Sequence, residues 1–105
     1  MDITFEVSGG FGGLFAQKPL VYRVALAELP EPERMALKTL VEASGLRSLR
    51  LPAPPRQPRG QKYRLTLNEG GQTNTLECDD VGAPATLRPL LAHLQQRALA
   101  ARAKG

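Results

Sequence analysis

The chain has 105 residues, a net charge of +4 and 42% hydrophobic residues, which fits one domain with an aliphatic core. No stretch approaches the roughly 20 consecutive apolar residues of a membrane-spanning helix, and the acidic, alternating start at residues 1–6 lacks the pattern of a secretory signal. We therefore expect one soluble, intracellular domain, residues 1–105, that does not enter a membrane.

The N-terminal part alternates between apolar and polar residues, which is typical of strands with one buried face. This pattern predicts strands at residues 3–8 and 20–26. Gly9–Gly13 holds four glycines in five positions, too permissive for a strand or helix interior, and predicts the loop of a hairpin between the two strands.

A helix is predicted at residues 32–44. Prolines and acids at residues 30–33 suit its first turn, and Gly45 supplies a left-handed stop. Its apolar stripe follows helical spacing, with Met35 or Ala36 as an extension, and contains Leu37, Leu40, Val41 and Ser44.

The second half predicts a hairpin and a final helix. Apolar and polar residues alternate along residues 63–67 and 73–78, on either side of turn residues 68–71. A helix is then expected to begin between Pro84 and Thr86 and to reach about Ala103. Its apolar face comprises Leu87, Leu90, Leu91, Leu94 and Ala98, and its tail, Ala100–Gly105, is expected to fray. The order ββαββα predicts an α+β fold, a four-stranded antiparallel sheet with both helices on one face.

Between these halves, Arg47–Gly60 is rich in proline and arginine and is predicted to be a connector. Residues 46–64 carry six basic residues and no acid, so the whole excess of positive charge lies there. A solvated loop is one interpretation, and a footprint for nucleic acid or an acidic protein surface is another. Tyr63 is the only aromatic residue in this basic segment, residues 47–64, so stacking on bases is poor and nucleic acid is the less favoured partner.

Residues able to do chemistry are few. Cys78 is the only cysteine and His93 the only histidine, and they lack the spacing of a disulfide or a zinc site. Asp79 and Asp80 are interpreted as a turn residue and a helix-leading cap, not as paired catalytic carboxylates. The sequence predicts a binding protein that is not an enzyme and holds no metal or cofactor.

Several short motifs in a fixed order carry a resemblance. They are Gly9-Gly10-Phe11 after the first strand, Leu29-Pro30 before the leucine-rich helix, Tyr63–Leu67, Glu69–Gly71 and Leu87–Leu91. Together the residues from Ile3 to about Ala98 resemble emfourin, the protealysin-inhibitor family. The resemblance implies an inhibitor of thermolysin-like zinc metallopeptidases, made in the bacterial cytoplasm.

Such inhibition needs a loop that fills the substrate cleft, an apolar side chain for a specificity pocket, and an oxygen that approaches the catalytic zinc. We predict contacts with the protease in two segments, which comprise Gly9, Gly10, Phe11, Gly12, Gly13, Leu14 and Phe15, and then Leu26, Glu28 and Leu29. Core packing is the alternative for Leu26 and Leu29. A non-catalytic scaffold subunit is the alternative function, and the oligomeric state is left open.

Overall fold

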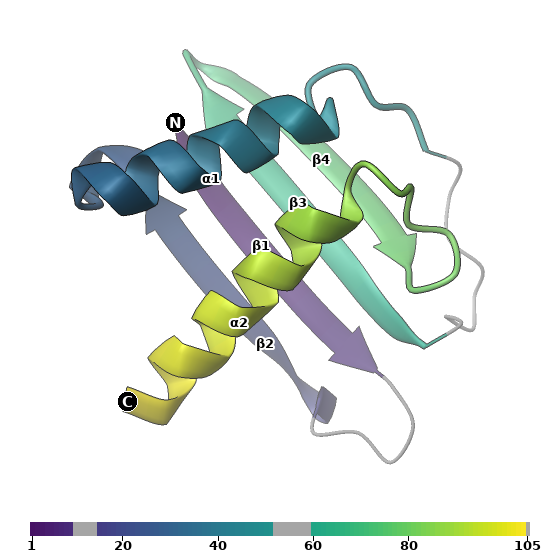
Figure 1. Cartoon of the computed structure of the whole chain (residues 1–105). Helices are drawn as coiled ribbons and strands as arrows, with labels where there is room; N and C mark the ends of the chain where they lie inside the picture. Colours follow the sequence, from purple (N-terminus) through teal and green to yellow (C-terminus); the bar gives the residue numbers. More distant parts are fainter. Residues whose placement is uncertain (10–14, 52–59, 105) are drawn as a thin grey trace.

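The computed structural model describes the backbone of residues 1–9, 15–51 and 60–104, and the side chains of residues 1–8, 20–51 and 60–101. The elements are β1 (Asp2–Gly9), β2 (Phe15–Ala25), a short 3-10 helix η1 (Leu26–Glu28), α1 (Glu31–Ser44), β3 (Gln61–Glu69), β4 (Gln72–Asp79) and α2 (Arg88–Lys104) (Figure 1). The predicted order ββαββα is confirmed.

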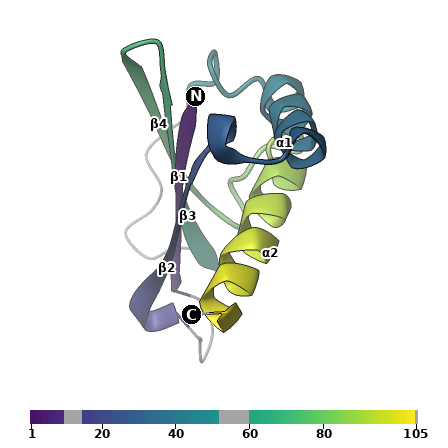
Figure 2. The same cartoon turned by 90° about the vertical axis from the view of Figure 1, so that its left-hand side faces the viewer.

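The four strands form one antiparallel sheet in the order β2-β1-β3-β4. Both helices cover the same face of this sheet, and no described helix lies on the opposite face (Figure 2). The predicted fold class is therefore confirmed, and β2 and β4 are the two edge strands.

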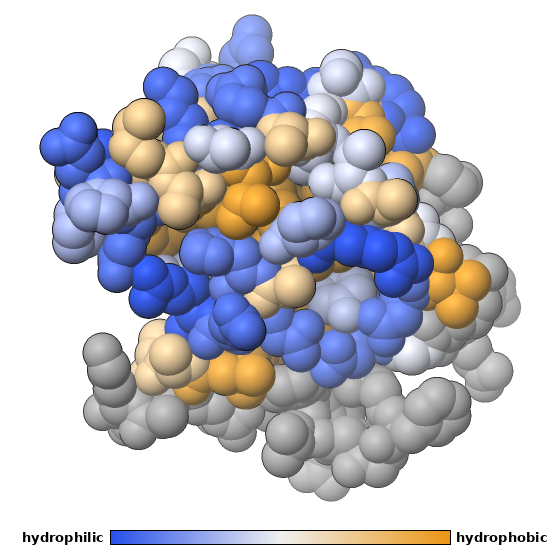
Figure 3. All heavy atoms as spheres, in the orientation of Figure 1, coloured by the Kyte–Doolittle hydropathy of each residue, from blue (hydrophilic) through white to orange (hydrophobic). Residues whose placement is uncertain are grey.

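The core lies between the sheet and the two helices. On β1, Ile3, Phe5 and Val7 are at most 1% exposed, while the residues between them face the open side of the sheet. All five residues of the predicted apolar face of the final helix are buried, at 5% exposure or less: Leu87, Leu90, Leu91, Leu94 and Ala98. The outer surface around the helices is mainly polar, with separate hydrophobic patches (Figure 3).

The β3–β4 hairpin turns on two glycines. Gly70 and Gly71 have φ values of 56° and 81°, and Glu69 pairs with Gln72 across the turn. A two-residue turn with positive φ at both central positions is type I′, whose twist matches that of the flanking strands. The predicted turn is therefore confirmed and narrowed to these two glycines.

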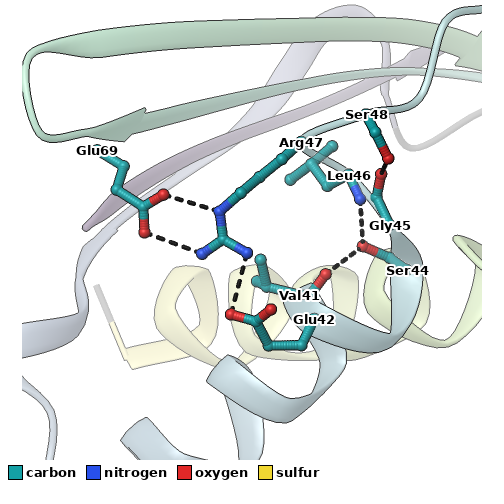
Figure 4. A network of polar contacts seen from close by, with 8 residues as sticks. All are labelled: Val41, Glu42, Ser44, Gly45, Leu46, Arg47, Ser48 and Glu69. Atoms are coloured by element: carbon teal, nitrogen blue, oxygen red, sulfur yellow. Dashed lines mark hydrogen bonds and ion pairs between the residues drawn. The ribbon is translucent and has the colours of Figure 1, made fainter.

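An arginine joins this hairpin to the end of α1 (Figure 4). Arg47 donates from Nε and Nη2 to the two carboxylate oxygens of Glu69, at 2.7 and 2.9 Å, and from Nη1 to Glu42 at 3.0 Å. The hydrogen bonds from Arg47 hold the pKa of Glu69 below its usual range. Gly45, with φ of 68°, ends α1 as predicted and turns the chain towards Arg47.

Several predicted boundaries differ from the structure. β2 begins at Phe15 instead of Leu20, and α2 begins at Arg88, which places Pro89 in the first helical turn, where no intrahelical N–H bond is lost. The extension of the α1 stripe was wrong, because Met35 is 55% exposed and Ala36 is also exposed. α2 continues to Lys104, and fraying of its last turn stays a prediction.

Within the described residues, no helix is long and apolar enough to cross a membrane.

Truncation of Leu90 tests this assignment of the core. Leu90 is fully buried on α2, whereas Leu99 on the same helix is 40% exposed. Leu90→Ala should lower the free energy of unfolding by about 2 to 5 kcal/mol through lost burial and a residual cavity, measured by urea denaturation. Leu99→Ala serves as the control and should change it by less than about 0.5 kcal/mol. Equal effects would contradict the placement of the α2 face.

Candidate functional site

One end of the sheet gathers the ends of two segments that are far apart in the sequence. Gly9, the last residue of β1, is in register with Phe15 of β2 on one side and with Gln61 of β3 on the other. Gly9 and Phe15 flank the glycine-rich segment, and Gln61 follows the proline- and arginine-rich connector. Both segments therefore join the sheet at the same end.

The carboxylate of Asp80 fixes the first residues of β3 at this end. Its Oδ2 accepts the backbone N–H of Gln61 at 2.6 Å, and its Oδ1 accepts the hydroxyl of Tyr63. The backbone N–H of Asp80 also donates to the carbonyl of Gln61 at 3.0 Å, which extends the β3–β4 pairing beyond the last strand residue. Charge-assisted hydrogen bonds of this kind are among the stronger ones in proteins.

Gly60 is required by this arrangement. Its φ is 88°, and a Cβ at this position would overlap a carboxylate oxygen of Asp80 and lie 2.9 Å from the Cβ of Asp80. The absence of a side chain therefore lets the connector enter β3 directly against the carboxylate. We call Gly60, Gln61, Tyr63 and Asp80 the Asp80 clasp.

Further contacts tie the Asp80 clasp to α2. Gln95 of α2 donates to the side-chain oxygen of Gln61 at 3.3 Å, and the Tyr63 hydroxyl lies 3.1 Å from the same oxygen. Arg88, the first residue of α2, donates to the carbonyl of Asp80 at 2.9 Å. Burial and the hydrogen bond to Asp80 raise the pKa of Tyr63 far above its usual value, so its hydroxyl remains a donor at neutral pH.

The predicted roles of the two neighbouring carboxylates are half correct. Asp79 accepts the N–H of Gly82 at 2.7 Å and so organises the turn after β4, as expected of a turn residue. Asp80 was expected to lead the final helix, and this was wrong, because its side chain bonds to Gln61 and Tyr63 of β3 instead. Sequence reasoning missed this role because the partners lie 17 and 19 residues away.

The predicted contact residues fall into two separate places. Gly10, Phe11, Gly12, Gly13 and Leu14 lie outside the described residues, and Gly9 and Phe15 lie beside the Asp80 clasp in the sheet register.

Leu26, Glu28 and Leu29 lie at the opposite end of β2, which has 11 residues and therefore spans about 35 Å. The structure does not bring the two predicted segments together.

The second segment also offers little apolar surface. Leu26 is 5% exposed and belongs to the core, and Leu29 is half-buried against it, so the core-packing alternative holds for Leu26 and in part for Leu29. Glu28 is exposed.

The described part of the basic segment is largely paired with acids. Arg64 and Lys62 lie 3.2 and 3.6 Å from the carboxylate of Glu77, and Arg47 is held by Glu69 and Glu42. These pairs reduce the positive charge that the segment presents to solvent. The solvated-loop interpretation therefore needs amending, because these three residues are tied to the sheet and to α1.

Within the described part of the chain, neither Cys78 nor His93 is placed as a reactive nucleophile or base. Burial, with the Asp79 and Asp80 carboxylates, raises the pKa of the Cys78 thiol to about 11, so the thiolate is scarce at neutral pH. Burial and the nearby Arg97 lower the pKa of His93. Among residues 1–9, 15–51 and 60–104, no group of three or more His, Cys, Asp or Glu side chains is placed to hold a metal ion.

Both ends of the glycine-rich segment are thus held on paired strands at one end of the sheet. The chain belongs to the Emfourin family, whose model matches residues 5–95. Emfourins are an inhibitor family, and membership suggests a role as a metallopeptidase inhibitor. Comparisons with curated proteins and with solved structures gave no match.

Substitution of Gly60 tests the Asp80 clasp. Gly60→Ala should lower the free energy of unfolding by about 3 kcal/mol, because it adds backbone strain and displaces a carboxylate with two hydrogen bonds. Gly71→Ala is the control, since Gly71 has a similar φ of 81° but an added Cβ there meets nothing within 4 Å. It should cost about 1 to 2 kcal/mol from strain alone. Equal losses in urea denaturation would contradict the clasp.

Proposed function

We propose that the chain inhibits thermolysin-like zinc metallopeptidases and that the sheet end at the Asp80 clasp faces the substrate cleft. The observation that carries the proposal is the match to the Emfourin family over residues 5–95. The choice of target rests on the resemblance to the protealysin inhibitors, and the cytoplasm as the place of action is part of the same proposal.

The location rests on where the glycine-rich segment joins the sheet. Gly9 pairs with both Phe15 and Gln61, so the segment begins and ends on strands that are fixed by their ladders and by Asp80. An anchored loop loses less entropy on binding than a free peptide does. Glycines also allow the backbone to approach a partner closely, so that a carbonyl oxygen can reach the catalytic zinc.

Phe11 is the side chain that we assign to the specificity pocket. Thermolysin-like enzymes favour bulky apolar side chains just after the scissile bond, and Phe11 lies in the middle of the glycine-rich segment. The competing segment is disfavoured because Leu26 is 5% exposed and is already used by the core. Large, well-packed aromatic anchors commonly dominate the energetics of an interface.

The role of a nucleic-acid-binding domain is disfavoured by the ion pairs of the basic segment. Arg47, Lys62 and Arg64 all have carboxylate partners within 4 Å. Each partner offsets a charge that phosphate contacts would need, and this weakens the electrostatic attraction that supplies most non-specific binding.

Inhibition constants for single variants test the proposal. Progress curves of peptide hydrolysis by a thermolysin-like protease should show inhibition by the wild-type chain. Phe11→Ala should raise the inhibition constant about tenfold or more, because it removes the apolar anchor. Leu29→Ala should leave the constant within about threefold, provided that the variant remains folded by circular dichroism.

Met35→Ala is the matched control, because Met35 is a 55% exposed apolar residue on α1, away from the sheet end. It should leave inhibition unchanged. No inhibition of any thermolysin-like protease by the wild-type chain would overturn the function. Loss of inhibition by folded Leu29→Ala, with Phe11→Ala still active, would move the site to the opposite end of β2.

A further inference from the structure

β4 is an edge strand, and its outer backbone groups can be identified. Asp80 and Gln61 form a hydrogen-bonded pair, because the N–H of Asp80 donates to the carbonyl of Gln61 at 3.0 Å. In an antiparallel ladder such pairs alternate with pairs that direct their backbone groups away. Thr73, Thr75 and Glu77 therefore direct their N–H and C=O groups outward. Among the described residues, no backbone hydrogen bond joins these three to a neighbour beyond β4.

A hollow lined by both polar and apolar residues lies beside this outer edge. It has a volume of about 290 Å³, and its rim includes Thr73, Thr75 and Glu77. The rest of its lining contains four leucines, of which Leu46 and Leu76 are buried and Leu49 and Leu51 are half-buried: Leu46, Leu49, Leu51 and Leu76. Outward-directed backbone groups and a hollow that exposes Leu49 and Leu51 thus occur side by side on this edge, as far as the described residues show.

The strand at the opposite edge, β2, contains a proline, which β4 does not. The same alternation, carried through the register, turns the backbone groups of Leu20 towards β1, and Pro19 precedes Leu20 where the β1–β2 register shifts. Proline has no N–H to offer, and proline and charged residues are common devices that block pairing at an edge. The β4 sequence, residues 72–79, has no proline, and its charged residues are Glu77 and Asp79.

The charge beside the hollow indicates what kind of segment would fit. Arg50 lines the hollow and is exposed, and its Nη1 donates to the carbonyl of Leu49 at 3.0 Å. No carboxylate of the described residues forms an ion pair with Arg50. A carboxylate on an incoming chain would complement this charge.

We propose that the outer edge of β4 is a strand-addition site for an extended segment of a partner protein that carries a large apolar residue and a nearby acid. The segment pairs through its backbone with Thr73, Thr75 and Glu77 and packs the apolar side chain on Leu49 and Leu51. Its acid lies against Arg50. This surface is separate from the sheet end proposed to face the protease.

A labelled peptide tests the site. The probe is an eight-residue peptide that alternates threonine with leucine and ends in two aspartates, titrated into the ¹⁵N-labelled chain. The amide signals of Thr73, Thr75 and Glu77 should shift in a saturable manner. Arg50→Glu should weaken binding about tenfold, whereas Arg23→Glu, an equally exposed charge reversal on β2, should not change it.

A backbone variant isolates the pairing from the charge. Thr75→Pro removes one outward N–H and should abolish binding, while Val21→Pro removes an outward N–H from β2 and should leave it intact. If Thr75→Pro does not fold, the pair of arginine variants still decides the matter. No shift at about 1 mM peptide, or binding unaffected by Arg50→Glu, would overturn the proposal. Concentration-dependent dimerisation in light scattering that Thr75→Pro abolishes would also overturn it, because the edge would then bind a second copy.

Discussion

The carboxylate of Asp80 is the contact on which one whole end of the sheet depends. It holds the N–H of Gln61 and the hydroxyl of Tyr63, and it lies where any side chain on residue 60 would have to be. Because Gly9 pairs with Gln61, the same carboxylate indirectly positions the last residue of β1 and, next to it, the first residue of β2. A single acidic side chain on the turn after β4 thereby stabilises both ends of the glycine-rich segment and the point where the connector enters β3.

The two ends of the sheet differ in what they hold together. At the far end of β2, Leu26 is buried in the core. At the same end of the sheet, Arg47 joins α1 to the β3–β4 hairpin through Glu42 and Glu69. The end at the Asp80 clasp holds both ends of the glycine-rich segment on hydrogen-bonded strands. A protease inhibitor needs this anchoring, because the loop must fit a cleft without a large loss of entropy on binding.

The sequence alone predicted the parts of the fold that local patterns determine. Alternation along residues 3–8 and 63–67, the αL glycine at Gly45 and the leucine face of α2 are signals of short range, and the structure has all of them. The long-range contacts could not be predicted, because no local pattern shows that Asp80 reaches Gln61 or that Arg47 reaches Glu69. The two predicted contact segments differ from these contacts, because the strand predicted at residues 20–26 lies between them, and the structure lengthens that separation to an 11-residue strand.

Hydrogen–deuterium exchange of the chain, alone and in complex with a thermolysin-like protease, tests the central claim most directly. If the end at the Asp80 clasp enters the cleft, amides from Gly9 to Phe15 and at Gln61 will exchange more slowly in the complex, and those of Leu26 to Leu29 will not change. Protection confined to Leu26–Leu29, with unaltered exchange at Gly9–Phe15, would contradict the account.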